Sequence, residues 1–233
     1  DRKETVDRSV IKNWLTKDEN DDLVLDKAVI ANYISELAKK YDTVGTERTF
    51  STYDNQEITV SGGNYGWVID QEKETDALYQ DIMDKKTEVR EPVYEQEAQS
   101  RNTNDIGYSY IEIDLTRQRM VLYQSGSPVV DTGLVADSST LTGVYALGEK
   151  ESSAVPGGRD GETVDFWMPF TDKLGIYGDS GLVITGTDLS DETGDSGDFG
   201  SSEESVDFGS SDSWMSTEGC IVLPEEQAQT IYQ

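Results

Sequence analysis

Cys220 is the only cysteine among 233 residues, and it is the residue best suited to nucleophilic chemistry. It follows Thr217, Glu218 and Gly219 and precedes an apolar run, an arrangement typical of a thiol presented at the start of a strand. A cysteine attacks as its thiolate, and a free thiol has a pKa of about 8.5. The backbone N–H groups of Gly219 and Cys220 could form an oxyanion hole, because glycine permits a close approach. The local sequence therefore predicts a site for acyl transfer.

The groups that would activate this thiol are missing from the sequence. The chain contains no histidine, so no imidazole can accept the thiol proton. Glu218 lies two residues before the thiol, and nearby negative charge raises the pKa of a thiol. Without a general base, attack loses roughly 10²–10⁴-fold in rate. An isolated cysteine is more often a small buried hydrophobic residue, and this structural role is the alternative to a nucleophile.

Three further residues are candidates for the same site. Tyr177 ends a short strand-like run, but a phenol has a pKa near about 10 and is a poor base at neutral pH. Its alternative role is that of an ordinary strand tyrosine. Trp167 and Met168 are apolar and precede a proline, which predicts a place in the core or in the wall of a cleft.

The net charge of −28, from 47 acidic and 19 basic residues, restricts the partners. Such a field repels nucleic acids and anionic membranes, so neither is an expected partner. No run approaches the roughly 20 apolar residues of a membrane span. Residue 1 is Asp and no signal-peptide pattern follows it, so we interpret the chain as a mature form or an excised fragment, which leaves room for an export or anchor segment upstream.

Residues 1–104 mix helix and strand signals, which predicts an α+β domain. Asp26 and Asp70 are suited to be N-caps, because each is followed by apolar residues at helical spacing. Two strand-like runs lie between the expected helices, at 48–53 and 57–60.

Residues 105–233 are rich in short strand-like runs and poor in helix signals. The boundary between the two parts falls in a polar stretch at 95–107 that lacks periodicity and is predicted to be a linker. The density of runs predicts a mainly-β sandwich or barrel. The expected strands are 110–115, 120–123, 128–135, 144–147, 164–168, 174–177, 182–185 and 220–223. Pro224 is placed to begin a helix that runs to Gln233.

Residues 186–213 consist mainly of Gly, Ser, Asp and Glu and carry little apolar content. The run Asp198–Ser202 recurs as Asp207–Ser211. We interpret this segment as a solvated acidic insertion. The alternative is a calcium-binding turn repeat, since carboxylates in glycine-rich turns are suitable ligands, but the glycine spacing of known repeats is not reproduced.

Several motifs resemble, in order, those of the L,D-transpeptidases of bacterial cell-wall synthesis, which have a YkuD-type catalytic domain. The motifs are Asn104–Gly107, Tyr110–Thr116, Phe166–Phe170, Gly175–Tyr177 and Thr217–Val222. Upstream, Tyr65–Asp70 and Arg90–Tyr94 resemble the peptidoglycan-binding domain that precedes the catalytic domain in such proteins. The resemblance implies a peptidoglycan-binding α+β domain at 1–104 and an L,D-transpeptidase-like domain at 105–233.

This resemblance implies a transferase that acts on peptidoglycan stem peptides and needs no metal and no cofactor. Cys220 would attack the carbonyl between an L-centre and a D-residue of a donor stem and release D-Ala. It would then pass the acyl group to the amine of a neighbouring stem, which makes a 3→3 cross-link. Trp167, Met168 and Thr217 would contact the substrate, and carbapenems would acylate the same thiol. The expected location is extracellular, in association with the cell wall.

The chain departs from the family at the polar positions of the site. The family's base histidine falls on Tyr177, the histidine beside the nucleophile on Glu218, and the following asparagine on Val222. Only the thiol of Cys220 and its neighbour Gly219 are kept. We therefore expect a catalytically impaired relative, a pseudoenzyme candidate. The alternatives are an active transpeptidase in which Tyr177 orients the thiol, and a non-catalytic scaffold that binds peptidoglycan.

Overall fold

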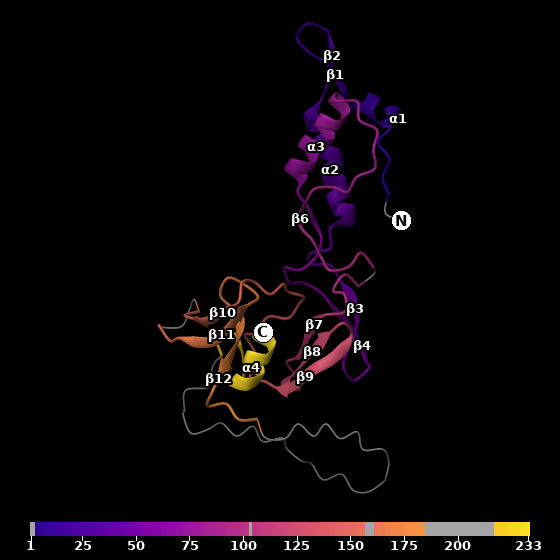
Figure 1. The fold of residues 1–233 in the computed structure, drawn as a ribbon. Coiled ribbons are helices and arrows are strands. Elements are labelled where there is room, and N and C mark those ends of the chain that lie inside the picture. The colour runs from indigo at the N-terminus through magenta and orange to yellow at the C-terminus, as the bar shows by residue number, and fades with distance from the viewer. Residues whose placement is uncertain (1–2, 103, 157–160, 185–216) are drawn as a thin grey trace. The chain divides into compact units, whose positions relative to one another are not determined.

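The computed structural model describes residues 3–102, 104–156, 161–184 and 217–233, so the acidic segment 186–213 lies outside the described residues. The chain forms two compact units (Figure 1). The first unit contains residues 1–46 and 65–105, and the second contains residues 47–64 and 106–233. The sequence-based division at 104/105 differs in two respects, because the segment 47–64 packs with the second unit and Asp105 belongs to the first.

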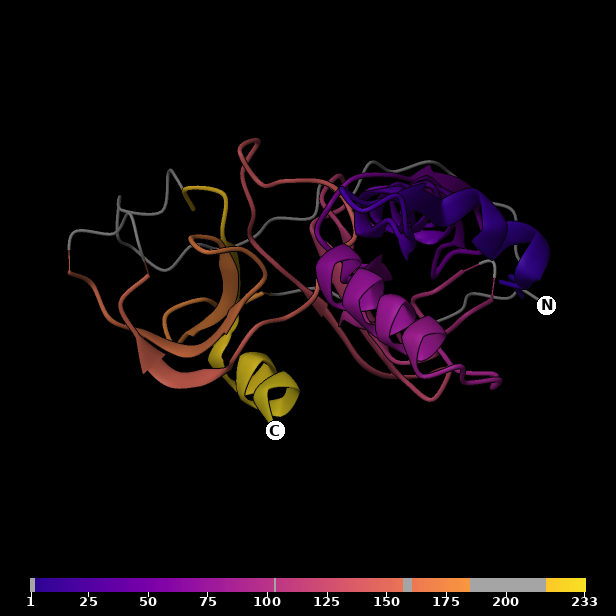
Figure 2. The same cartoon turned by 90° about the horizontal axis from the view of Figure 1, so that it is seen from above.

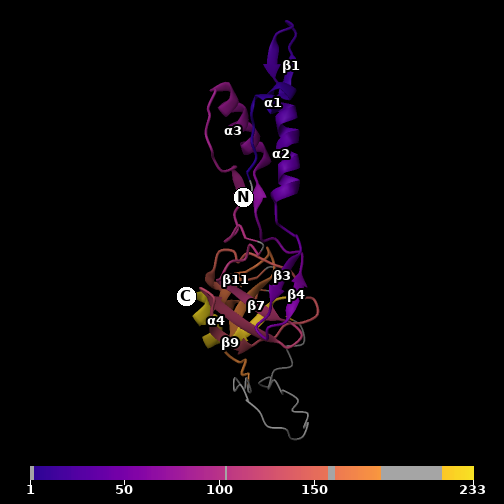
Figure 3. The ribbon, with the colours of Figure 1, turned by 90° about the vertical axis from the view of Figure 1, so that its right-hand side faces the viewer.

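The first unit is built on two helices, α2 (Lys27–Tyr41) and α3 (Gln71–Met83). Figure 3 shows them side by side. Both predicted N-caps are confirmed, since Asp26 accepts hydrogen bonds from the N–H groups at 28 and 29, and Asp70 accepts one from the N–H at 73. The apolar faces of the helices share one buried cluster with Trp14. The smaller elements are α1 (Arg8–Ile11), a 3₁₀ turn (Lys12–Trp14), the antiparallel pair β1 (Leu15–Lys17) and β2 (Leu23–Leu25), and the antiparallel pair β5 (Val68–Ile69) and β6 (Tyr94–Gln96).

The predicted linker at 95–107 is partly structured, because β6 includes its first residues. Asp105 is buried, and its carboxylate accepts a hydrogen bond from Thr43 Oγ1. The Tyr65 hydroxyl donates to the Asp105 carbonyl and accepts from the Gln99 N–H, each at 2.8 Å. The polar residues of this stretch therefore satisfy buried partners of the first unit, a role that composition alone does not reveal.

The second unit contains two principal sheets within its described residues. Three antiparallel strands lie in the order β7 (Tyr110–Asp114), β8 (Arg119–Gln124) and β9 (Ser127–Gly133). Four strands form the other sheet in the order β10 (Glu151–Ala154), β11 (Val164–Pro169), β12 (Gly175–Asp179) and β13 (Ile221–Pro224). The first two pairings of this sheet are antiparallel, and β12 and β13 are parallel. The expected mainly-β architecture is confirmed.

The four-stranded sheet separates two buried clusters. Helix α4 (Glu225–Tyr232) follows Pro224, as predicted, and lies beside this sheet, mainly against β12 and β11 (yellow in Figure 2). Strand alternation sends Ile176, Ile221 and Leu223 into a core that also contains Ala228 of α4. The other face carries a second cluster, which we call the thiol cluster: Val164, Trp167, Tyr177, Leu182, Cys220 and Val222.

Two of the predicted strands are wrong. Residues 144–147 form no strand, because the Val144 N–H donates to the Gly62 carbonyl at 3.2 Å and the Ala146 N–H donates to Asn64 Oδ1 at 2.9 Å. The segment 144–147 is therefore hydrogen-bonded to residues 62–64, which follow β4, and not to a neighbouring strand of a sheet. The described part of the run 182–185 also forms no strand.

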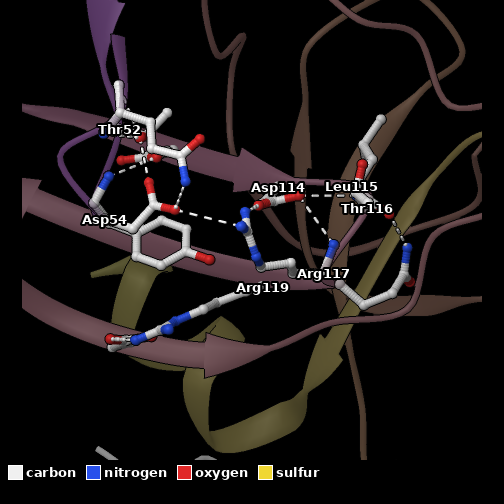
Figure 4. A network of polar contacts seen from close by, with 12 residues as sticks. Thr52, Asp54, Asp114, Leu115, Thr116, Arg117 and Arg119 are labelled. Carbon is white, nitrogen blue, oxygen red and sulfur yellow. Dashed lines mark hydrogen bonds and ion pairs between the residues drawn. The ribbon is translucent and has the colours of Figure 1, made fainter. Parts of the chain in front are cut away.

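The hairpin of β3 (Arg48–Ser51) and β4 (Glu57–Val60) is joined to the three-stranded sheet by polar contacts. The Tyr53 N–H donates to Glu112 Oε1 of β7 at 2.9 Å. The Arg117 guanidinium lies between Asp114, at 2.8 Å, and Asp54, at 3.4 Å (Figure 4). The hairpin is therefore part of the unit that carries the thiol.

Candidate functional site

Cys220 lies directly before β13, at the end of a tight turn. The Cys220 N–H donates to the Thr217 carbonyl at 2.9 Å, and φ is 51° at Glu218 and 84° at Gly219. Positive φ at both central positions is the signature of a type I′ turn. A Cβ added to Gly219 would lie 3.1 Å from the Ser139 carbonyl oxygen, so glycine suits this position for two reasons. The turn uses the Cys220 N–H, which removes this group from the oxyanion hole expected from sequence.

The turn is anchored at its first residue. The Thr217 N–H donates to Asp137 Oδ2 at 2.8 Å, and the Asp137 N–H donates to Thr217 Oγ1 at 3.2 Å. Two residues away from Asp137, Val135 and Val222 exchange a pair of backbone hydrogen bonds of 2.9 Å each. The first residue of the turn and the strand that follows the turn therefore have fixed partners.

The carboxylate of Asp137 is held in its ionised form. Burial alone would raise the pKa of Asp137, but hydrogen bonds from the side chains and N–H groups of Ser139 and Thr217 outweigh burial and lower this pKa to about 2. Asp137 therefore carries a negative charge at any pH near neutrality.

Tyr177 and Cys220 point to the same face of the sheet. The parallel pairing of β12 and β13 places Tyr177 opposite Val222, and Cys220 precedes Val222 by two residues. All three side chains are buried in the thiol cluster, with exposed fractions of 3% for Cys220 and 1% for Tyr177. The structure thus brings together the two residues that the sequence singled out for chemistry.

Trp167 also belongs to the thiol cluster, whereas Met168 does not. The Trp167 ring covers Gly175, where an added Cβ would lie 2.6 Å from Cη2 of the ring. Met168 is fully buried in the cluster on the opposite face. Trp167 and Met168 are consecutive in β11, and successive side chains of a strand point to opposite faces. The structure therefore does not place Met168 with the thiol.

The surroundings of the thiol are mainly apolar. Its cluster contains valine, leucine and tryptophan side chains beside Tyr177, and Glu218 is exposed to solvent. An apolar environment disfavours the thiolate. Within the described residues, no group of three or more His, Cys, Asp or Glu side chains could hold a metal ion. No helix in this part of the chain is both long enough and apolar enough to cross a membrane.

Asp137 is a residue of this site that the sequence did not predict. The run Asp137–Thr140 has the composition of a turn in which the aspartate binds the backbone two residues later, and the Ser139 N–H does donate to Asp137 Oδ1 at 2.8 Å. This local signal predicts a turn. It gives no indication of the contact with Thr217, which is 80 residues away in the chain.

Residues 2–90 match the model of a domain family described as "Putative peptidoglycan binding domain". The comparison with curated proteins gave no match. Two solved structures are similar over 97% of the chain, each with 26% identity and a TM-score of 0.62. One is the Ldtfm–avibactam carbamoyl enzyme, of which 83% is covered, and the other is a cysteine-to-serine mutant of the Enterococcus faecium L,D-transpeptidase, of which 85% is covered. The chain has the fold of an L,D-transpeptidase.

This result confirms the resemblance and the fold class that the sequence predicted, including the peptidoglycan-binding domain at the N-terminus. The positions at which this chain differs from the motifs of the L,D-transpeptidases can now be located in the fold. Tyr177 and Val222, which take the places of a histidine and an asparagine in the resemblance, are both in the thiol cluster. Glu218, which takes the place of the other histidine, is in the turn before the thiol.

Proposed function

We propose that this protein acts on peptidoglycan stem peptides by L,D-transpeptidase-type acyl transfer at Cys220, and that the reaction is slow. The proposal rests mainly on one observation. Cys220 and Tyr177 lie on the same face of the four-stranded sheet, in one buried cluster with Trp167, and the chain has the fold of an L,D-transpeptidase. The peptidoglycan-binding domain model matched by residues 2–90 supports the same substrate polymer. The proposed place of action is outside the cell, at the wall.

The proposed reaction has two steps at one sulfur atom. The Cys220 thiolate attacks the carbonyl carbon between the L-centre and the D-residue of a donor stem, and the C–N bond to D-Ala breaks, with a proton transferred to the leaving amine. The resulting thioester is attacked by the side-chain amine of a second stem. A new amide forms, the amine loses a proton and the thiol is regenerated. No metal or cofactor takes part in this scheme.

The low rate follows from the surroundings of the sulfur. The chain has no imidazole to accept the proton, and the thiol cluster is mainly apolar. The thiol is therefore expected to remain protonated at neutral pH. The loss of a general base costs roughly 10²–10⁴-fold in rate. Trp167 stays in the proposal as a residue of the substrate side. Thr217, which is buried and bonded to Asp137 through its N–H and Oγ1, does not, and neither does Met168.

A non-catalytic scaffold that binds peptidoglycan is the second candidate. It is favoured by the burial of the sulfur, since only 3% of Cys220 is exposed. A stem peptide must reach the sulfur for acyl transfer, whereas binding through the first unit requires neither a thiolate nor an exposed thiol.

Mass spectrometry after exposure to a carbapenem tests the catalytic candidate. We expect slow formation of a covalent adduct that is absent from Cys220→Ser. A parallel reaction with iodoacetamide measures whether the thiol is accessible. Alkylation of Cys220 without any carbapenem adduct, even after long exposure, would reject acyl transfer and leave the scaffold.

A pull-down with purified sacculi tests binding separately. We expect both the native chain and Cys220→Ser to sediment with sacculi, because the sulfur is not required for binding. An unrelated acidic protein of similar net charge is the control for nonspecific association. Failure of both variants to sediment would reject peptidoglycan as the partner of the first unit.

A further inference from the structure

We infer that Asp137 is a positioning residue for the Cys220 thiol and acts through Thr217. The inference rests on the proposed function, because a thiol needs positioning only if it reacts. Asp137 is not part of the thiol cluster, and its contacts run to the turn that carries the thiol.

The Asp137 carboxylate uses its two oxygens on two different segments. Oδ1 accepts hydrogen bonds from the N–H and the hydroxyl of Ser139. Oδ2 accepts the Thr217 N–H at 2.8 Å. One charged group therefore joins the loop 137–139 to the first residue of the nucleophile turn. Hydrogen bonds to a charged acceptor are stronger than those between neutral groups, so this junction is firm.

Thr217 transmits this constraint to the thiol. Its N–H and Oγ1 are both bound by Asp137, and its carbonyl accepts the Cys220 N–H at 2.9 Å. Thr217 is itself buried, with 3% of its surface exposed. A change at Asp137 that releases Thr217 thus also releases the turn that sets the direction of the Cys220 side chain.

The chemistry of Asp137 supports positioning and argues against proton transfer. Its pKa is about 2, because the hydrogen bonds from Ser139 and Thr217 outweigh the effect of burial. A carboxylate with so low a pKa is a poor general base near neutral pH. The part that Asp137 can play is to fix geometry, and it can do so over the whole neutral range.

The test compares four variants in the full chain. Asp137→Asn removes one of the accepting oxygens, and Thr217→Val removes the hydroxyl without changing the net charge. Thr217→Ser keeps the hydroxyl and is the rescue variant. Asp114→Asn is the matched control, because Asp114 also accepts N–H groups in a turn of the same unit, at Thr116 and Arg117.

The readout is the rate of carbapenem acylation of Cys220 divided by its rate of alkylation by iodoacetamide, at one pH. This ratio cancels the fraction of thiolate and the general exposure of the sulfur, so it reports positioning. We expect the ratio to fall roughly tenfold or more for Asp137→Asn and Thr217→Val, since small misplacements of a reacting group cost up to about 10²-fold. Thr217→Ser and Asp114→Asn should stay within about twofold. An unchanged ratio in Thr217→Val, with or without a lower melting temperature, would overturn the inference. If Asp137→Asn does not fold, the two Thr217 variants decide.

A second measurement separates this inference from the proposed function. If the native chain forms no carbapenem adduct, the proposed acyl transfer fails, and the hydrogen exchange of the Cys220 N–H then judges the role of Asp137. We expect faster exchange in Asp137→Asn and Thr217→Val and native exchange in Thr217→Ser and Asp114→Asn. Equal exchange in all variants would show that Asp137 does not hold the turn.

Discussion

Tyr177 lies directly opposite Val222 in the parallel pair of β12 and β13, and both side chains share a face with Cys220. This relationship places an aromatic ring and an isopropyl group where a proton acceptor would serve a thiol. The low reactivity that we propose for Cys220 therefore has a structural cause, because the described residues of β12 and β13 on this face include no basic group.

Restoring imidazoles should raise the reactivity of the thiol. We predict that Tyr177→His combined with Glu218→His increases the alkylation rate of Cys220 at neutral pH, by up to about 10²-fold, because an imidazole can accept the thiol proton. The measurement is the rate of iodoacetamide alkylation as a function of pH. Tyr177→Phe is the control, since it keeps the ring and removes the hydroxyl. A double variant that reacts like the native chain would show that position 177 does not serve the thiol, and a loss of reactivity in Tyr177→Phe would mean that the phenol itself orients it.

The turn before the thiol should be improved by asparagine. Glu218 has φ of 51°, a region that asparagine tolerates far better than glutamate, and Asn-Gly is the preferred pair of a type I′ turn. We predict that Glu218→Asn raises the free energy of unfolding by roughly 0.5–1 kcal/mol. Urea denaturation measures this change. Gly219→Ala is the opposing variant, because its added Cβ would be strained at φ of 84° and would crowd the Ser139 carbonyl. A lower urea midpoint for Glu218→Asn contradicts the assignment of this turn.

The features that could be predicted well from the sequence depend on residues that are close together in the chain. Asp26 and Asp70 cap helices through contacts within three residues, and the apolar run after Cys220 becomes β13. The features it missed depend on distant partners. The contact of Asp137 with Thr217 joins residues 80 positions apart, and the hydrogen bonds of Val144 to the chain after β4 override a strand-like composition.

Local periodicity also failed where the strand itself is irregular. Trp167 and Met168 are consecutive in β11, so regular alternation sends them to opposite faces, but regular alternation would also separate Val164 from Trp167. The bulge in β11 and a φ of 55° at Phe166 shift the alternation, so that Val164 and Trp167, three residues apart, both belong to the thiol cluster. A bulge depends on the pairing with the neighbouring strand, and this pairing cannot be read from a single run of residues.

The buried carboxyl group of Glu112 should make the second unit less stable as the pH rises. Glu112 is 9% exposed, and within the described residues its Oε2 atom has no hydrogen-bond partner. Burial raises the pKa of Glu112, and the charges of Asp54 and Asp114 act in the same direction, whereas the Tyr53 N–H and Arg119 oppose them. The folded protein therefore holds this proton more tightly than the unfolded chain, whose glutamate pKa is about 4.3. Stability from this group is present at low pH and is lost as the pH rises from the unfolded pKa through the folded one.

The substitution Glu112→Gln tests the predicted direction of this pH dependence of stability. The variant stays uncharged, so we predict that its free energy of unfolding exceeds that of the native chain at neutral pH by about 1 kcal/mol, and that the difference shrinks as the pH falls toward about 4.5. Urea denaturation over this pH range measures the difference. Asp114→Asn is the control, because hydrogen bonds from Arg117 and Thr116 outweigh burial and lower the pKa of Asp114. Its pH dependence should therefore have the opposite sign. A constant difference between Glu112→Gln and the native chain at every pH would contradict the raised pKa of Glu112.

The first unit should depend on the ion pair of Arg90 and Glu74. The Arg90 guanidinium binds both carboxylate oxygens of Glu74, at 2.8 and 3.0 Å, and Glu74 also accepts the Val93 N–H at 2.9 Å. The side chains are 27% and 9% exposed, so the loss of Arg90 would leave a largely buried carboxylate without its cation. We predict that Arg90→Ala lowers the free energy of unfolding of this unit by about 2 kcal/mol.

Arg90→Lys should recover only part of this loss, because lysine keeps the charge but cannot make the paired contact. The measurement is chemical denaturation together with the hydrogen exchange of α3, which carries Glu74. Lys39→Ala is the matched control, since Lys39 pairs with Glu36 in the same unit with both side chains exposed, and its removal should cost less than about 1 kcal/mol. If Arg90→Ala and Lys39→Ala have equal effects, the Arg90–Glu74 pair behaves as an exposed ion pair and does not hold the segment 90–94 against α3.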